Sequence, residues 1–331
     1  MPRRRRRTSL SDTGELDFLR RLLPYFRPGA AVIVGPGDDC AVVAVGNRRW
    51  LLTTDSLVDD VHFRRDWMTA RQLGRKAYLV NASDIAAMGG RPRFCLVSAG
   101  APPSYRFSAL MGIHRGIEAA ARETGAHVVG GNLSRSRTLF VSVTLIGEAP
   151  RRPLLRRGAR PGDALFVTGQ LGAAALGLRR LRRDAHARGY AVSRFREPPC
   201  RLAAGAVLAR TGIASAAIDI SDGLLRDLGH LCAASGVGAR IDLARVPCAP
   251  EARRHGAALA LHGGEDYELL CAVPPHRLSM VERLRSRLGC DFTQIGHVMP
   301  SRFHVRVVDS AGRPLRTAMA GFDHFAPGRR T

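Results

Sequence analysis

The sequence predicts a mixed α/β fold that is built in two halves. Short apolar runs alternate with longer segments that have the period of amphipathic helices. The alternation stops at residues 149–163, which are rich in Pro, Gly and Arg, and it starts again after them. With 331 residues, the chain is long enough to give each half its own hydrophobic core.

The order of the elements supports this division. In the first half we expect strands at residues 31–34, 41–45, 50–54, 94–99, 127–130 and 139–147, with helices at 69–88 and 106–124. In the second half we expect strands at 164–169, 216–220, 239–243, 267–273, 292–298 and 303–309, with helices at 171–187, 198–211, 222–235 and 276–288. We therefore expect a basic, disordered arm at 1–13, an N-terminal domain at 14–150 and a C-terminal α/β domain at 151–331.

Composition argues against several classes of protein. No apolar run approaches the roughly 20 residues of a membrane span, and the basic N-terminus lacks the apolar segment of a secretory signal. The seven cysteines include no CxxC pair, so we expect free thiols rather than disulfides or a zinc site. These features predict a cytoplasmic protein without a membrane partner.

The formal net charge of +23 invites a nucleic-acid interpretation. Lys76 is the only lysine, however, and an excess of arginine is typical of a GC-rich coding sequence. Aromatic residues make up 6% of the chain and no RNA-recognition motif is present, so nucleic acid is not the favoured partner. The run Arg3–Arg7 leaves RNA binding open as an alternative. Because Lys76 lacks the GxxxxGK[ST] context of a P-loop, a nucleotide would have to be held in another way.

Acidic and hydroxyl side chains gather where the predicted strands end. Taken alone, each has an ordinary explanation; Asp222, for example, stands where a helix N-cap is expected. Together they are the hard oxygen ligands that Mg²⁺ prefers, and grouped carboxylates repel one another unless cations neutralise them. The sequence therefore predicts a site with several magnesium ions for a polyphosphate. The residues predicted to form this site are Asp38, Asp39, Thr53, Thr54, Asp55, Asp84, Asp219, Ser221, Asp222, Glu265 and Asp266.

Eight motifs, taken in order, resemble those of the thiamine-monophosphate kinases. They are GDDCAVV, TTDSLVDDVHF, KAYLVNASDIAAMGG, VVGGN, LLRRGARPGD, DISDGLLRDLGHL, GGEDYELL and the terminal GFDHF, and the resemblance runs from residue 14 to residue 325. That family belongs to the superfamily of aminoimidazole ribonucleotide synthetase and selenophosphate synthetase. The resemblance implies the two-domain fold of that superfamily, in which the N-terminal half binds ATP and Mg²⁺ and forms a homodimer through its sheet.

The resemblance also implies a role for each matching residue. The implied metal ligands are Asp39, Thr53, Thr54, Asp55, Asp84, Asn132, Asp219 and Asp222. The implied ATP contacts are Gly131, Asn132, Arg156 and Ser221, and the implied contacts to thiamine monophosphate are His62, Glu265 and Phe322. Asn132 stands where the family usually has an aspartate, so it offers Mg²⁺ a neutral oxygen. Lys76 falls where the family commonly has a lysine.

The implied reaction is the transfer of the ATP γ-phosphoryl group to the phosphate of thiamine monophosphate, with several Mg²⁺ ions. The acceptor phosphate has a second pKa near 6, so it is already anionic at neutral pH and no general base is required. We therefore expect no catalytic acid or base and assign His62 to substrate contact. The alternatives are another phosphotransfer enzyme of the same superfamily and, because of Asn132, a weakly active protein that binds thiamine phosphates or ATP.

Overall fold

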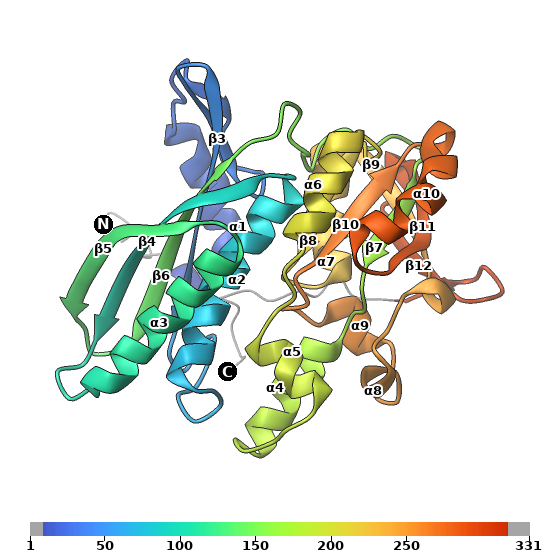
Figure 1. Cartoon of the computed structure of the whole chain (residues 1–331). Helices are drawn as coiled ribbons and strands as arrows, with labels where there is room; N and C mark the ends of the chain where they lie inside the picture. Colours follow the sequence, from blue (N-terminus) through green and yellow to red (C-terminus); the bar gives the residue numbers. More distant parts are fainter. Residues whose placement is uncertain (1–8, 317–331) are drawn as a thin grey trace, which may run out of the picture.

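The computed structural model describes residues 9–316, and the predicted substrate contact Phe322 lies outside them. Figure 1 shows two β-sheets, one in each half of the chain, with helices packed on them. The predicted mixed α/β fold in two halves is confirmed. The first sheet ends with strand β6 at Glu148 and the second begins with strand β7 at Ala164, so the expected boundary at residue 150 falls in their connection.

The first sheet has six strands in the order β1-β2-β3-β6-β4-β5. All neighbours are antiparallel except β4 and β5, which run parallel. The strands are β1 (Val32–Val34), β2 (Ala41–Val45), β3 (Arg48–Val58), β4 (Arg91–Ala101), β5 (His127–Arg135) and β6 (Phe140–Glu148). Helices α2 (Ala70–Ala87) and α3 (Phe107–Glu123) cover one face of this sheet (Figure 1).

The opposite face of the first sheet carries exposed apolar side chains. Phe94 and Leu96 of β4 belong to it, and the Leu96 side chain is 40% exposed. Trp50 of β3 packs against Phe94 with 6.0 Å between ring centroids. This face is therefore an uncovered apolar surface, which we call the outer face.

The second sheet has seven strands in the order β13-β12-β9-β11-β7-β10-β8. They are β7 (Ala164–Thr168), β8 (Ala216–Ile220), β9 (Val237–Asp242), β10 (Glu268–Val273), β11 (Phe292–Pro300), β12 (Val305–Val308) and β13 (Pro314–Leu315). The α-helices of this half are α4 (Ala173–Arg183), α5 (Tyr190–Arg196), α6 (Leu202–Thr211), α7 (Leu224–Ser235), α8 (Pro250–Arg253), α9 (Ala258–His262) and α10 (Leu278–Leu288). Alternate residues of β7, β8 and β10 face two apolar cores, one shared with α7 and the other with α6 and α10.

Short elements complete the fold. Four 3-10 turns lie at η1 (Leu23–Tyr25), η2 (Leu243–Arg245), η3 (Pro275–Arg277) and η4 (Ser301–Phe303). Helix α1 (Leu10–Leu22) was not expected, and it contains a non-helical residue at Gly14. Its N-cap Ser9 exchanges hydrogen bonds with Asp12 in a capping box, so residues 10–13 are helical and the expected arm at 1–13 is too long.

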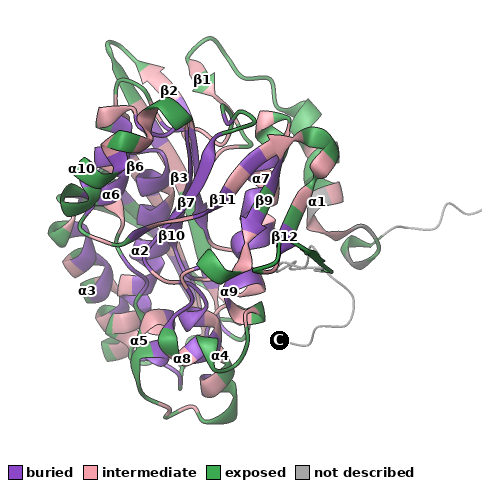
Figure 2. Ribbon diagram, turned by 90° about the vertical axis from the view of Figure 1, so that its right-hand side faces the viewer, coloured by how far each residue is buried: buried purple, intermediate pink, exposed green. Residues whose placement is uncertain are grey.

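Helix α2 joins the two halves. Figure 2 shows it among the most buried elements, together with the strands of both sheets. Its C-terminal turn packs on α6 of the second half, where Gly205 allows close approach, since a Cβ there would lie 1.9 Å from the carbonyl oxygen of Ala86. Side chains on α2 can therefore meet residues of both halves at one site.

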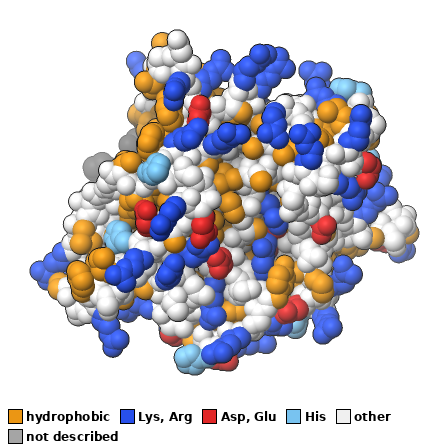
Figure 3. Space-filling view, viewed as in Figure 1, with side chains coloured by type: hydrophobic (Ala, Val, Ile, Leu, Met, Phe, Trp, Pro, Cys, Tyr) orange, Lys and Arg blue, Asp and Glu red, His pale blue; other side chains and the backbone are white. Residues whose placement is uncertain are grey.

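The charge of the surface and the length of the helices relate to the expected nucleic-acid and membrane partners. Arginine side chains are spread over the whole face seen in Figure 3, with acidic side chains between them. Within residues 9–316, no helix combines the length and the apolar character needed to cross a membrane.

Candidate active site

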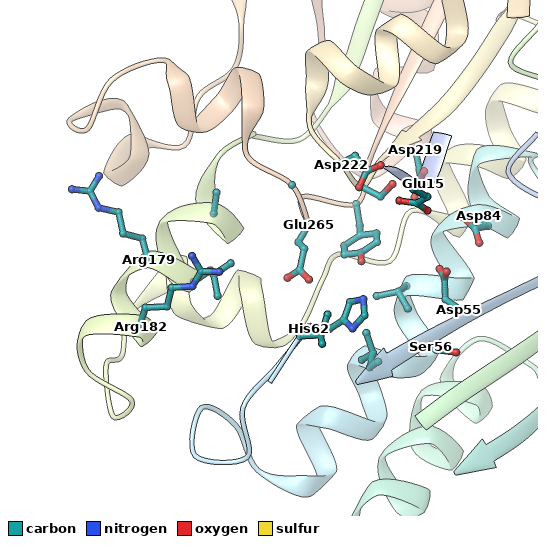
Figure 4. A pocket seen from close by; sticks show the side chains of 18 of the residues that line it. Glu15, Asp55, Ser56, His62, Asp84, Arg179, Arg182, Asp219, Asp222 and Glu265 are labelled. Carbon is teal, nitrogen blue, oxygen red and sulfur yellow. The ribbon is translucent and has the colours of Figure 1, made fainter. Parts of the chain in front are cut away.

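A cavity of about 670 Å³ lies between the two halves (Figure 4). This volume is in the range of small-molecule sites. Seven of the residues singled out from the sequence lie along its wall. Those from the first half are Asp55, His62 and Asp84, and those from the second half are Asp219, Ser221, Asp222 and Glu265.

Three carboxylates meet at one end of this cavity. Oxygens of Asp39, Asp84 and Asp219 lie within 4.8 Å of one another. Asp39 and Asp219 are buried, and Asp84 is half-buried. Burial raises the pKa of Asp39 to about 6 and that of Asp219 to about 8, and the neighbouring carboxylates add to both increases. Burial and the same neighbours also raise the pKa of Asp84 well above its usual range.

One oxygen of the carboxylate cluster has no hydrogen-bond donor within residues 9–316. Oδ2 of Asp39 is buried and has no hydrogen-bond partner among the described residues. Carboxylate oxygens gathered in this way, with one of them unsatisfied, are suited to hard divalent cations such as Mg²⁺. Asp39, Asp84 and Asp219 are therefore the residues best placed to hold such an ion.

Helix α2 positions much of this cluster. It begins at a capping box in which the backbone N–H of Gln72 donates to Oγ1 of Thr69 and the Gln72 side chain accepts from the Thr69 backbone N–H. One turn of its inner surface then presents Asn81, Ser83 and Asp84. Asn81 Oδ1 accepts from the backbone N–H of Asp55 at 2.9 Å, and Ser83 Oγ donates to Asp219 Oδ2 at 2.7 Å.

Strand β3 adds a hydroxyl on the same side. Thr53 Oγ1 donates to Asp84 Oδ2 at 2.5 Å. Side chains alternate across a strand, so Thr53 and Asp55 share the inner face, where Asp55 lines the cavity. Both fit the role implied for them.

Arg156 supplies a positive charge at the cluster. Its Nη2 and Nε donate to Oδ1 of Asp39 at 2.7 and 3.2 Å. The Asp38 carboxylate accepts from the backbone N–H of Arg156 and so fixes the start of the second half beside the loop before β2. Arg156 is thus held beside the carboxylate cluster.

Thr54 is placed differently from the expectation. Its hydroxyl lies on the outer face, 3.0 Å from Thr144 Oγ1, because it alternates with Thr53 and Asp55 along β3. The side chain of Thr54 therefore does not join the carboxylate cluster.

Within one chain, Gly131 and Asn132 also lie away from the carboxylate cluster. The expected strand ended at residue 130, but pairing with β4 extends β5 to Arg135. Gly131 allows close contact, since a Cβ there would lie 1.9 Å from the Val97 carbonyl oxygen. Strand β5 is three strands from β3, roughly 14 Å at the usual spacing. Asn132 pairs in register with Ser98, hence lies on the outer face, and its Nδ2 donates to Ser134 Oγ at 3.0 Å.

The turn after β8 carries Ser221 and Asp222 to the cavity. Oδ2 of the buried Asp227 accepts the backbone N–H groups of Asp222 and Gly223, both at 3.0 Å. Asp222 also pairs with Arg226, one helical turn on, at 3.3 Å. Asp227 therefore holds the turn, and Asp222 points its carboxylate toward the cavity (Figure 4).

His62 and Glu265 lie in the middle of the cavity (Figure 4). Nδ1 of His62 accepts from the backbone N–H of Val58 at 3.1 Å, which places the proton of the neutral ring on Nε2. Glu265 has a left-handed backbone with φ of 68°, which is uncommon outside glycine. Its Oε2 accepts from Nζ of Lys76 at 2.6 Å.

Sequence reasoning missed Tyr267 and two arginines of this site, and it gave Asp266 a different role. Tyr267 lines the cavity, also with a left-handed backbone (φ 49°). Asp266 Oδ2 accepts from the backbone N–H of Gly172 at 2.7 Å and so fixes the start of α4. Arg179 and Arg182 of α4 stand at the end of the cavity away from Asp84 (Figure 4). Asp266 was expected in the magnesium site, but its carboxylate oxygen Oδ2 accepts from the backbone instead. The motif GGEDYELL could have pointed to Tyr267, whereas nothing in the sequence marks these arginines among so many.

Comparison with known proteins places this site in a family. The N-terminal half matches the family described as "AIR synthase related protein, N-terminal domain" over residues 37–149. The C-terminal half matches "AIR synthase related protein, C-terminal domain" over residues 160–309. The thiamine-monophosphate kinase of Salmonella typhimurium is 36% identical over 329 residues, which cover 95% of this chain and 98% of that protein. The chain belongs to the thiamine-monophosphate kinase family.

Two further relatives agree with this family. The thiamine-monophosphate kinase of Mycobacterium tuberculosis is 41% identical over 282 residues, covering 81% of this chain and 83% of that protein. The solved structure of AaThiL complexed with AMPPCP and TMP has a TM-score of 0.82 and 31% identity, covering 97% of this chain and 100% of that chain. The thiamine-monophosphate kinase fold thus extends over nearly the whole chain.

Proposed function

We propose that this protein transfers the γ-phosphoryl group of ATP to the phosphate of thiamine monophosphate and so forms thiamine diphosphate and ADP. The observation that carries the proposal is one cavity with Asp84 and Asp219 of the carboxylate cluster at one end and His62 and Glu265 in the middle. Arg156 pairs with Asp39 of the same cluster. This arrangement provides one region for phosphates and another for a cationic heterocycle. The AaThiL structure, with an ATP analogue and TMP bound, supports this assignment.

The carboxylate cluster fits several Mg²⁺ ions. Asp39, Asp84 and Asp219 would hold them, and Asp55 and Asp222 extend the set along the cavity wall. When bound, the ions supply the positive charge that lets two anionic substrates approach. The unsatisfied Oδ2 of Asp39 and the pKa values raised by burial and by neighbouring carboxylates support this proposal, because Arg156 alone does not neutralise three buried or half-buried carboxylates.

No residue has to remove a proton in this reaction. An oxygen of the acceptor phosphate attacks the γ-phosphorus, the bond between that phosphorus and the β,γ-bridging oxygen breaks, and ADP leaves with the electron pair. The acceptor is already ionised near neutral pH. We therefore assign His62 and Glu265 to substrate contact, Arg156 and Ser221 to ATP, and positioning of the two substrates to the cavity as a whole.

We further propose that two copies of the chain pair through the outer face of the first sheet. Its exposed apolar side chains support this, since a surface of this kind is typical of an interface. Thr54 and Asn132 lie on the same face, so the roles implied for them, and for Gly131, would require the second copy. We also propose a cytoplasmic location and two domains that meet near residue 150, the first of which includes α1.

The test is direct. Purified protein is incubated with ATP, Mg²⁺ and thiamine monophosphate, and thiamine diphosphate and ADP are separated by chromatography. We expect both products in equal amounts and neither without Mg²⁺. Asp84→Asn serves as the control for a contaminating kinase, because it should fold normally and form no product. ADP without thiamine diphosphate would mean an ATPase and would contradict the proposal.

A further inference from the structure

The only lysine of the chain is fully buried between the two halves. Lys76 lies on α2, and its side chain is 0% exposed. Its Nζ donates to the carbonyl oxygen of Phe195 at 2.9 Å and lies 3.6 Å from the centroid of the Phe195 ring. The third contact is the 2.6 Å hydrogen bond to Glu265 Oε2. A buried ammonium ion is costly unless it is paired, and here every direction is occupied.

Lys76 and its two partner residues come from different parts of the fold. Lys76 belongs to the first half, whereas Phe195 ends α5 and Glu265 precedes β10 in the second half. Trp67 of the first half packs edge-on against the Phe195 ring, with 6.0 Å between the ring centroids. The amino group therefore joins the halves directly beneath the cavity, but it has no access to a ligand.

The backbone around Glu265 is fixed independently of the lysine. The N–H of Glu265 donates to the Ser221 carbonyl at 2.7 Å, and the N–H of Tyr267 donates to that of Ile220 at 2.8 Å. The next acidic side chain, Asp266, holds the start of α4. What the backbone leaves undetermined is the direction of the Glu265 side chain, which is 21% exposed to the cavity.

We propose that Lys76 is a positioning residue for the substrate: it holds the Glu265 carboxylate toward the cavity through Oε2 and leaves Oε1 to contact the thiamine moiety. Among residues 9–316, no other donor is hydrogen-bonded to this carboxylate. The thiamine moiety carries a fixed positive charge, and a carboxylate in a restrained orientation binds it better than a mobile one. This inference rests on the proposed function, in which Glu265 contacts thiamine monophosphate.

A double-mutant cycle tests it. We expect Lys76→Met and Glu265→Gln each to raise KM for thiamine monophosphate by about 10- to 100-fold, the range of a lost charged hydrogen bond. KM for ATP should change less than about twofold, since the contacts of Lys76 are to Phe195 and Glu265 and not to Arg156. The double variant should be no worse than Glu265→Gln alone, because Lys76 then has nothing left to orient. It also removes both charges together, so it avoids leaving an unpaired buried ion.

A neighbouring ion pair provides the matched control. Arg75 Nε pairs with Glu197 at 2.7 Å, again linking α2 to the end of α5, but this pair does not line the cavity. Arg75→Gln with Glu197→Gln should leave both KM values unchanged. If the Lys76→Met and Glu265→Gln losses multiply in the double variant, or if Lys76→Met leaves KM for thiamine monophosphate unchanged, Lys76 does not act through Glu265 and the proposal is overturned.

A second measurement does not depend on turnover. Because Lys76 is the only lysine, trinitrobenzenesulfonate can modify one ε-amino group, and mass spectrometry distinguishes it from the N-terminal amine. We expect Lys76 to be protected in the wild type and modified at least about tenfold faster in Glu265→Gln, because the unpaired amino group is no longer held. Equal rates in the two proteins would overturn the Lys76–Glu265 link even if the wild type formed thiamine diphosphate. Absence of product with a protected Lys76 would instead contradict the proposed function alone.

Discussion

Arg156 donates from Nη2 to Oδ1 of Asp39 at 2.7 Å, and the other oxygen of that carboxylate is buried with no partner in the described part of the chain. One guanidinium therefore stands against three carboxylates. Burial, together with the neighbouring carboxylates, raises the pKa of Asp219 to about 8, and the charge imbalance makes a divalent cation the natural complement of the cluster.

The first prediction is that Asp39→Asn abolishes turnover without destabilising the metal-free protein. The amide removes one negative charge and can donate to a neighbouring carboxylate. We expect the melting temperature without Mg²⁺ to stay the same or to rise by roughly 2–4 °C, which corresponds to about 1 kcal/mol of relieved repulsion. Thermal unfolding with and without Mg²⁺ measures it, and the variant should no longer respond to the ion.

Asp163→Asn is the matched control for this variant. Asp163 is equally buried, but its carboxylate accepts from Ser215 Oγ at 2.6 Å and from the backbone N–H of Arg160 at 3.1 Å. Replacing it should lower the melting temperature and leave the response to Mg²⁺ intact. A similar loss of stability in Asp39→Asn would mean that Asp39 is a structural residue.

The second prediction concerns pH. The pKa of Asp39 is raised to about 6 and that of Asp219 to about 8, mainly by burial. An acid whose pKa is raised by folding stabilises the folded state below its unfolded pKa of about 4, and this contribution is lost as pH rises toward the folded pKa. The metal-free protein should therefore lose stability between about pH 4 and pH 8.

Mg²⁺ binds the ionised carboxylates, so protons compete with it. We expect saturating Mg²⁺ to raise the melting temperature more at about pH 8 than at about pH 6. Sodium chloride at the same ionic strength is the control for screening. An equal increase at both pH values would show that the ion binds away from Asp39 and Asp219.

Local sequence patterns predicted much of the fold, but they did not predict its long-range arrangement, such as the strand order. Asp39 and Asp219 were selected as carboxylates beside strand ends and Asp84 as a carboxylate on a predicted helix, and the structure brings the three together. Asn132 was expected beside them, but its place depends on the strand order and on which face of β5 it takes, and neither is encoded in the segment 130–136 itself.

The Lys76–Glu265 pair shows the same limit. The two residues are 189 positions apart in the chain, and each belongs to a motif of its own. The sequence predicted that both matter, through the resemblance, but it did not predict that they touch. Helix α1 was missed for a different reason, since its residues 10–13 follow a run of arginines that is typical of a disordered segment.

The third prediction tests the outer face of the first sheet. We expect Leu96→Glu to convert a dimer to a monomer in light scattering after size-exclusion chromatography, because it places a charge within the proposed interface. Phe107→Glu is the control, since Phe107 is 79% exposed on α3, on the covered side of the sheet. A dimer in both variants would mean that two copies meet through another surface.

The last prediction concerns the arginines of α4. Arg179, Arg182 and Arg183 are exposed and line the cavity. Arg179 and Arg182 stand at its end away from Asp84 (Figure 4). Both proposed substrates are anions, so this positive end should speed their encounter with the cavity. Replacing all three arginines by glutamine should lower kcat/KM by about tenfold at low salt and leave kcat unchanged. At about 1 M salt, where the Debye length is only about 3 Å, the difference should vanish.

The control is the same replacement on α10, at Arg283, Arg285 and Arg287. It removes the same charge from exposed positions outside the cavity and should have little effect. Equal losses in the two triple variants would mean that net charge alone matters, and a loss that persists at high salt would mean that the α4 arginines contact the bound substrate.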